Sequence, residues 1–160
     1  MNLQQLKINK EIHVLARAVI IDQGMILLSR AKQFTPEFFV LPGGHIEHGE
    51  SARQALQREL LEESGFEFQV KRFVGCLECS FDMQNICHSH EYNLIFEAES
   101  FAIRAMHSLP SAIKLEWLSF EKLPEINLQP KSLKDCLKEW LKSDLNLSFQ
   151  SQMLCYTART

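Results

Sequence analysis

Apolar residues near the start of the chain are spaced as in β-strands. Residues 13–21 (HVLARAVII) form a nearly continuous apolar and β-branched run, and residues 25–29 form a second run. The turn-favouring tripeptide at 22–24 (DQG) lies between them, so the pattern predicts a β-hairpin. Arg17 interrupts the first run, and an arginine in such a strand either pairs with a buried acid or points into a ligand cleft.

Further apolar runs predict strands in the rest of the chain. Residues 68–81 form one long run with a bulge or bend expected at Gly75. Residues 90–98 are expected to return antiparallel to it, after a loop at 82–88. Together with the hairpin, these strands predict a mixed central sheet.

Two segments have helical signals instead. Ser51 with Gln54 three residues later is a capping box, and Gly65 is a natural left-handed stop, so a helix is predicted from about Ser51 to Ser64. After Pro130, apolar residues recur at three- and four-residue spacing and predict a C-terminal amphipathic helix. Its apolar positions are Leu133, Cys136, Leu137, Trp140 and Leu141. We therefore expect an α/β protein built as an α/β/α sandwich, with one helix on each face of the sheet.

The first predicted helix places carboxylates on its apolar side. At about 100° per residue, Glu59 and Glu63 project along the same line as Ala52, and Glu62 lies on the flank. Carboxylates held close together raise each other's pKa unless positive charge lies among them. A hard divalent cation with oxygen ligands, Mg²⁺ in particular, supplies that charge and also bridges substrate phosphates. The helix therefore predicts a metal site.

A motif of fixed spacing covers the same stretch. Gly44 is followed after five residues by Glu50, and seven more residues lead to residues 58–66 (RELLEESGF). This pattern resembles, without a mismatch, the signature box of the Nudix hydrolases, which cleave nucleoside diphosphates linked to another group. The resemblance implies a Nudix-type fold and attack by a metal-activated water on a phosphorus of a pyrophosphate linkage.

The resemblance also implies roles for residues of the box. The metal ligands would be the carbonyl of Gly44 and the side chains of Glu59, Glu62 and Glu63, with Mg²⁺ as the cofactor and Mn²⁺ as a substitute. Glu59, Glu62 and Arg58 are the expected catalytic residues. Arg58 lies four residues before Glu62, so it can pair with that carboxylate along the helix and hold it in place.

The general base is left open between Glu59 and a later glutamate such as Glu116. The loop at residues 105–114 contains no acid, which argues against a base from that loop. Glu50 precedes the helix and would have to fold back to reach the metal.

Three residues outside the box carboxylates are candidates for substrate binding. Arg17 interrupts its apolar strand, and His45 lies in the box loop close to where phosphates would bind. Phe39 occupies a position that is often aromatic in the family, two residues before the Leu-Pro-Gly-Gly step, although core packing explains it equally well.

Composition limits the other function classes. A chain of 160 residues fits one globular domain, which we assign to residues 1–143. The net charge of −3, without a long Lys/Arg run, argues against long nucleic acids and leaves a small nucleotide as the expected partner. The start of the chain lacks a signal-peptide pattern, no apolar run has membrane-spanning length, and the five cysteines are an odd number. We expect a cytoplasmic protein with reduced thiols and no membrane partner.

The end of the chain alternates apolar and polar residues. From 145 to 155 most odd positions are apolar, while the even positions up to 152 are polar. We expect residues 144–160 to form a C-terminal extension with an added edge strand, which could pair across a homodimer.

Two functions from different classes fit these features. The first is a Mg²⁺-dependent hydrolase acting on a nucleoside triphosphate, a nucleotide sugar or an ADP-ribose type of substrate. The second is a catalytically idle nucleotide sensor on the same fold. A sensor is expected to lose box carboxylates, and this chain retains all of them. The sequence therefore favours the enzyme.

Overall fold

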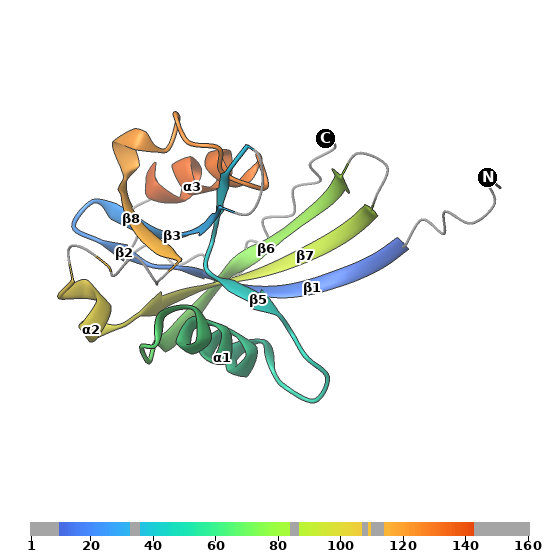
Figure 1. Cartoon of the computed structure of the whole chain (residues 1–160), viewed down its shortest axis with the longest axis horizontal. Helices are drawn as coiled ribbons and strands as arrows, with labels where there is room; N and C mark the ends of the chain where they lie inside the picture. The colour runs from blue at the N-terminus through green and yellow to red at the C-terminus, as the bar shows by residue number, and fades with distance from the viewer. Residues whose placement is uncertain (1–9, 33–35, 84–86, 107–108, 110–113, 143–160) are drawn as a thin grey trace.

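Two four-stranded sheets form the framework of the protein (Figure 1). The computed structural model describes residues 10–32, 36–83, 87–106, 109 and 114–142. The first sheet has the order β5 (Gly43–His45), β1 (Lys10–Val19), β7 (Cys87–Glu99) and β6 (Gln69–Met83). The second contains β2 (Ile21–Asp22), β3 (Met25–Ala31) and β4 (Phe38–Val40), with β8 (Leu115–Ser119) also paired to β3. The helices are α1 (Ala52–Ser64), α2 (Phe101–Arg104), α3 (Leu133–Lys142) and the short 3₁₀ helix η1 (Phe120–Lys122).

The first sheet is mixed, as the sequence predicts. β1 pairs in parallel with β7, whereas β5 pairs with β1 and β6 pairs with β7 in the antiparallel direction. The predicted single sheet is divided in two, however. β1 ends at Val19 and β2 begins at Ile21, so one apolar run supplies strands to both sheets. A continuous run of apolar residues cannot indicate such a change of partner.

The predicted hairpin connects β2 to β3 within the second sheet. Gln23 and Gly24 both have positive φ, at 46° and 77°. Two successive residues of positive φ match the twist of the flanking strands, which explains why the chain can turn tightly here. The hairpin prediction is confirmed.

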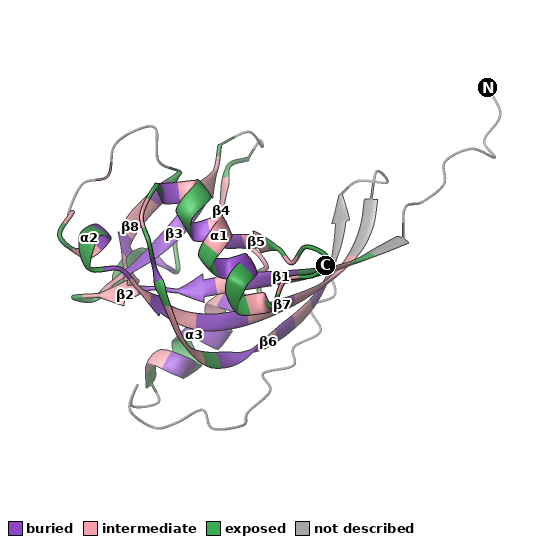
Figure 2. Cartoon of the chain, turned by 90° about the horizontal axis from the view of Figure 1, so that it is seen from below, coloured by how far each residue is buried: buried purple, intermediate pink, exposed green. Residues whose placement is uncertain are grey.

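α1 and α3 lie on opposite sides of the sheets (Figure 1). One core cluster joins Leu56 and Leu60 of α1 to buried residues such as Ala16. The other joins α3 residues such as Leu137 and Trp140 to buried residues of both sheets. Burial of each large aliphatic side chain contributes roughly 1.5–3 kcal/mol, so each helix is held by its apolar side. The predicted α/β fold with a helix on either face is confirmed, and buried residues concentrate in the middle of the long strands (Figure 2).

α1 begins and ends as its sequence predicts. The Ser51 side chain accepts a hydrogen bond from the backbone N–H of Gln54 at 3.3 Å, and the Gln54 side chain accepts one from the Ser51 N–H at 2.9 Å. Gly65, with φ of 76°, closes the C-terminal end by donating its N–H to the carbonyl of Leu61. The capping box fixes where the helix starts and therefore which way its glutamates project.

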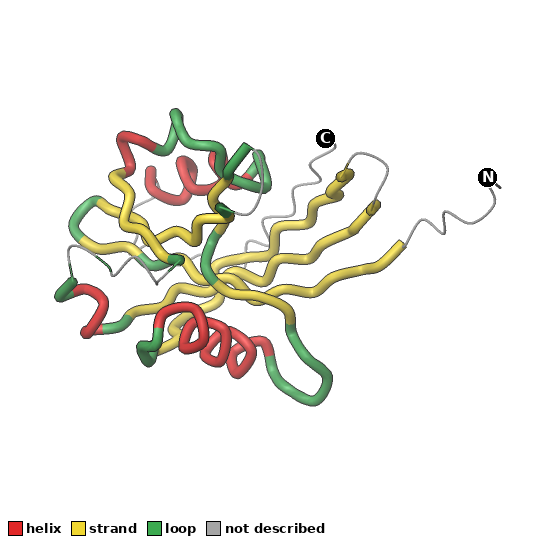
Figure 3. Tube along the Cα trace, in the orientation of Figure 1, coloured by secondary structure: helices red, strands yellow, loops and turns green. Residues whose placement is uncertain are grey.

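The long hairpin of β6 and β7 differs from its prediction in one respect. The register shifts around Phe73 and Gly75, which confirms the expected bulge. The predicted loop at 82–88 is too long, because Met83 already pairs with Cys87. Pairing between strands is made by backbone groups and does not need an apolar pattern. β1, β6 and β7 extend well beyond the helices (Figure 3).

Other expectations meet the structure only in part. The short helix α2 was not predicted, since four residues are too few to show a helical period. The C-terminal extension at 144–160 lies outside the described residues. None of the described helices is long and apolar enough to cross a membrane.

Candidate functional site

The Gly43–Gly44 step brings β5 close to both β1 and α1. Gly43 has φ of 121°, and a Cβ there would collide with the carbonyl oxygen of Ala16. A Cβ on Gly44 would lie 2.5 and 2.6 Å from the two carboxylate oxygens of Glu59. A side chain at position 43 would strike backbone, whereas one at position 44 would push the Glu59 carboxylate aside, so Gly44 makes room for an acidic side chain.

Glu63 lies beside the same step. Its Oε2 accepts a hydrogen bond from the Gly43 N–H at 3.2 Å. Burial raises the pKa of Glu63, and the charge of Glu59 adds to this effect, against the opposing influence of Gly43 and Arg17. The structure thus brings Glu59 and Glu63 together against the glycine step, as the helical projection predicts. The site carries an excess of negative charge.

Arg58 connects the box loop to the helix. It donates to both carboxylate oxygens of Glu50, at 2.7 and 3.2 Å, and to Glu59 at 3.0 Å. It also donates to the carbonyl of His45 at 3.1 Å. The hydrogen bond from Arg58 is the largest cause of the lowered pKa of Glu50. Arg58 therefore holds the loop and one of the candidate ligands in a fixed relation.

The predicted pairing of Arg58 with Glu62 is present as a looser ion pair. The two groups are 3.6 Å apart, and the Glu62 side chain is 61% exposed. The closer partner, Glu50, does fold back toward the helix, assisted by a hydrogen bond from the Glu47 N–H at 2.8 Å. Sequence reasoning missed this pair because residues eight apart across a loop have no regular spacing.

As far as the structure describes the chain, Arg17 is held by backbone carbonyls and by an amide side chain, and not by a hydrogen bond to an acid. Its Nη1 donates to the carbonyls of Leu41 and Gly43, at 3.1 and 2.7 Å, and its Nε donates to Asn93 Oδ1 at 3.3 Å. Burial lowers the pKa of Arg17, against nearby carboxylates that raise it. Gly43 accordingly accepts from Arg17 through its carbonyl and donates to Glu63 through its N–H, so this one residue links the two side chains.

Arg17 also borders a cavity of about 190 Å³ that both sheets and α3 enclose. Its walls are largely apolar, with a few polar side chains among them. The lining residues from the strands are Arg17, Phe38, Val40, Leu77, Cys79, Glu91, Asn93 and Ile95, and those from the loops and α3 are Leu41, Gln129, Pro130 and Leu133. Such an apolar cavity with a few polar groups is typical of a ligand pocket.

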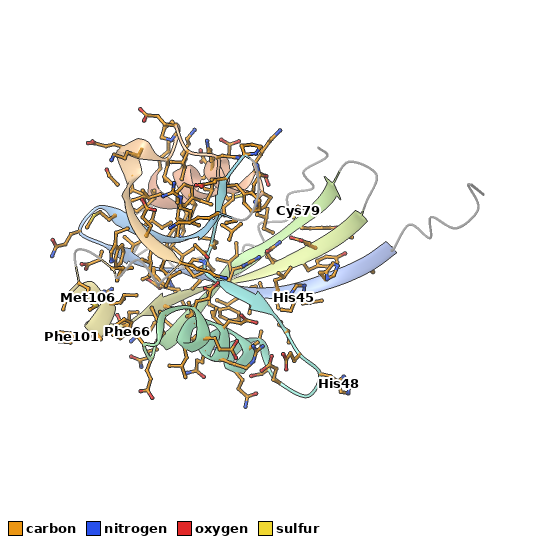
Figure 4. The ribbon with its side chains drawn as sticks, in the orientation of Figure 1. His45, His48, Phe66, Cys79, Phe101 and Met106 are labelled. Carbon is orange, nitrogen blue, oxygen red and sulfur yellow. The ribbon has the colours of Figure 1, made fainter. Side chains whose placement is uncertain are left out.

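The remaining candidates for substrate binding lie in different places. His45 is exposed, with its Nε2 3.1 Å from His13 Nδ1, and Figure 4 shows it beside β1. His48 lies at the tip of the loop between β5 and α1 (Figure 4). Phe39 packs against the core cluster that contains α3, while its neighbour Phe38 lines the cavity.

Two glutamates that follow the box in sequence, Glu91 and Glu116, lie in different parts of the structure. Glu116 lies on β8, 3.3 Å from Arg30, which in turn contacts Glu37 at 2.8 Å. Glu116 does not line the cavity, whereas Glu91 does. From the sequence, Glu91 is only one of several later glutamates, expected at a surface or strand edge, and Asn93 is not a candidate. Their alternation along one strand was the available signal, but it does not show which face meets a cavity.

The donor atoms near the glycine step suit a hard cation. Glu59, Glu63 and the backbone carbonyls offer only oxygen, the ligand type that Mg²⁺ prefers. The Glu59 carboxylate lies directly beside Gly44, where a Cβ would otherwise be. Within the described ranges, no three His, Cys, Asp or Glu side chains are already gathered as a finished metal site. The residues present therefore fit a cation that would keep several waters and bind phosphate.

Comparison with known proteins gives a consistent result. A family model described as the NUDIX domain matches residues 11–141. The NAD-capped RNA hydrolase NudC of Pseudomonas aeruginosa is 29% identical over 112 residues, which cover 69% of this chain and 38% of that protein. The chain thus spans well under half the length of this curated relative.

Solved structures share the fold. The E. coli ORF135 protein aligns with a TM-score of 0.62 and 25% identity, covering 84% of this chain and 94% of that one. The MutT protein from Methanosarcina mazei Go1 aligns with a TM-score of 0.64 and 20% identity, covering 84% of this chain and 96% of that one.

Proposed function

The chain belongs to the NUDIX family, and from this premise we propose that it is a Mg²⁺-dependent pyrophosphohydrolase acting on a nucleoside diphosphate linked to another group. The observation that supports this most directly is the placement of Glu59 and Glu63 against the Gly43–Gly44 step. Two carboxylates held together beside this glycine step favour a divalent cation, and a divalent cation favours a phosphate substrate.

The metal would be held by the Gly44 carbonyl and the side chains of Glu59, Glu62 and Glu63. When bound, the cation supplies charge neutralisation for the phosphates and lowers the pKa of a water molecule. Glu62 is the most exposed of the three glutamates, with 61% of its side chain accessible, so it would complete the site from the solvent side.

The protein's own residues would position the reacting groups. Arg58 holds Glu59 in place through the 3.0 Å hydrogen bond. Arg17 holds the glycine step through the carbonyls of Leu41 and Gly43. His45, exposed next to Gly44, is placed to contact a phosphate oxygen.

Hydrolysis adds one water across the anhydride. The water oxygen bonds to phosphorus, the bridging P–O bond breaks, and the water proton must be accepted by a base. We assign Glu59 as that base, because it lies in the site, whereas Glu116 is engaged with Arg30 in the second sheet.

The substrate would place its nucleoside in the cavity and its phosphates at the box. Arg17 borders both regions, so the two parts of one small molecule can be bound together. Nucleoside triphosphates, nucleotide sugars and ADP-ribose are the classes considered. The alternative, an idle nucleotide sensor, is disfavoured because Glu59, Glu62 and Glu63 are all present.

A panel of these nucleotides, assayed with Mg²⁺ or Mn²⁺ and with products identified by mass, tests the proposal. Wild-type protein should release a nucleoside monophosphate or diphosphate, and Glu59→Gln or Glu62→Gln should lower kcat by orders of magnitude without loss of folding. Glu125→Gln, an exposed glutamate outside the site, is the matched control. Tight nucleotide binding with no turnover across the panel would favour the sensor.

A further inference from the structure

The polar side chains of the cavity lie in one row on β7 and its neighbours. Glu91 and Asn93 alternate along β7, so they share one face of the sheet. In register across the sheet, Glu91 lies opposite Cys79 of β6, and Arg17 of β1 lies opposite Ile95. All of these residues line the cavity.

Asn93 is fully engaged and fixed in orientation. Its Oδ1 accepts from Arg17, and its Nδ2 donates to the Leu77 carbonyl at 3.4 Å and to Cys79 Sγ at 3.6 Å. Both of its polar atoms are therefore engaged, and the Oδ1 contact orients Arg17. This leaves Glu91 and Arg17 as the charged groups on the cavity wall.

Arg17 has one nitrogen remaining for a ligand. Nε and Nη1 are used by Asn93, Leu41 and Gly43. No acceptor from the described part of the chain lies within hydrogen-bond reach of Nη2. Because Arg17 lines the cavity, this N–H group can donate to a molecule bound there.

Glu91 has spare acceptor capacity. Among the described residues only the Cys79 thiol donates to it, over a long 3.8 Å contact. Burial, and after it the charge of Glu91, raises the pKa of Cys79 to about 12. The thiol therefore stays neutral, and it does not neutralise the Glu91 carboxylate. A carboxylate has room for several hydrogen bonds, so this partly buried one can accept from N–H donors of a ligand.

We propose that this cavity binds guanine, with Glu91 as the residue that determines base specificity and Arg17 Nη2 as its partner. The inference rests on the proposed nucleotide hydrolase function. Guanine presents two adjacent donors, N1–H and N2–H, followed by the O6 acceptor. A carboxylate accepts from both donors, and the guanidinium donates to O6.

The other bases match this wall less well. Adenine and cytosine present a single donor group beside an acceptor nitrogen, which would face one carboxylate oxygen without a hydrogen. Uracil and thymine have one N–H between two carbonyls. The cavity volume of about 190 Å³ lies below the range of about 300–1,000 Å³ for drug-sized ligands. This volume suits one nucleobase without its sugar and phosphates.

Hydrolysis of matched guanine, adenine, cytosine and uracil nucleotides tests the proposal. Wild-type protein should have the highest kcat/KM for the guanine substrate. Glu91→Gln should lower that value by about 10- to 100-fold and raise the relative use of adenine, because a glutamine amide offers one acceptor and one donor. Glu91→Asp, which keeps the charge but withdraws it from the ring, should also reduce the guanine preference.

Glu97→Gln is the matched control. Glu97 lies on the same strand and the same face as Glu91 but outside the cavity, and it pairs with Arg72 at 2.8 Å. It should keep the wild-type base preference. Thermal unfolding of every variant checks that altered preference does not arise from loss of folding.

Binding of the four nucleoside monophosphates, measured by calorimetry, separates this inference from the proposed function. Hydrolysis with equal kcat/KM for all bases, unchanged in Glu91→Gln, would overturn the guanine assignment and leave the hydrolase intact. Guanosine monophosphate binding that Glu91→Gln weakens, without hydrolysis of any substrate, would support the pocket and overturn the hydrolase.

Discussion

Gly44 has no room for a side chain, because the Glu59 carboxylate lies where a Cβ would be. Gly44 is also the first residue of the box motif. The steric contact with Glu59 therefore explains why the motif has a glycine at this position. Glu59 and Glu63 could be placed from the sequence because a capped helix fixes the direction of every side chain. The four-residue spacing also predicts the Arg58–Glu62 pair, whereas the Arg58–Glu50 and Arg17–Gly43 contacts could not be predicted, since they join segments whose separation has no period.

Gly44→Ala should therefore displace Glu59 and weaken divalent-cation binding by more than tenfold while the protein stays folded. Gly49→Ala is the control, because Gly49 has positive φ but nothing within 4 Å of its added Cβ. Cation affinity can be measured by calorimetry with Mn²⁺. Equal effects in the two variants would show that the contact between position 44 and Glu59 is not responsible.

Glu63 should make the metal-free protein sensitive to pH. Its pKa is raised by burial, so the unfolded chain releases this proton at lower pH than the folded protein does. The contribution of protonated Glu63 to folding stability is fully present below the ordinary glutamate pKa. It is lost as the pH rises through the raised pKa of Glu63 in the folded protein. With a chelator present, wild-type Tm should fall over this range relative to Glu63→Gln.

The measurement is thermal unfolding from about pH 4 to pH 7, with Glu125→Gln as the control for removing an exposed carboxylate. Added Mg²⁺ should then stabilise wild-type protein more than Glu63→Gln. Parallel pH profiles of wild-type and Glu63→Gln would contradict the burial of this charge.

At the scale of elements, α1 is the best-predicted part of the chain. The Ser51 capping box and the Gly65 stop are both local signals, and both occur as expected. The division into two sheets was not predictable, because β1 and β2 come from one uninterrupted apolar run. The short helix α2 left no periodic signal either.

Ser51→Ala should lower the free energy of unfolding by about 1 kcal/mol, since the N–H of Gln54 loses its acceptor. Chemical denaturation measures this loss. Gln57→Ala, at an exposed position inside the same helix, should change stability little. A loss in Gln57→Ala as large as that in Ser51→Ala would show that the cap does not anchor the helix.

At the scale of the whole molecule, the two sheets and α3 enclose the cavity while α1 carries the acidic residues on the other side. The backbone of Gly43, hydrogen-bonded to Arg17 and to Glu63, connects these regions. No pattern within one element predicts such a junction, because it arises only when β1, β5 and α1 pack together. The C-terminal strand, homodimer and cytoplasmic location stay predictions from the sequence.

The central claim is that the α1 carboxylates hold the divalent cation on which hydrolysis depends. Mn²⁺ binding followed by electron paramagnetic resonance, in wild-type protein, Glu59→Gln and Glu125→Gln, tests it most directly. We predict that wild-type protein and Glu125→Gln bind Mn²⁺ equally and that Glu59→Gln binds it at least tenfold more weakly. Wild-type Mn²⁺ affinity in Glu59→Gln would contradict the account.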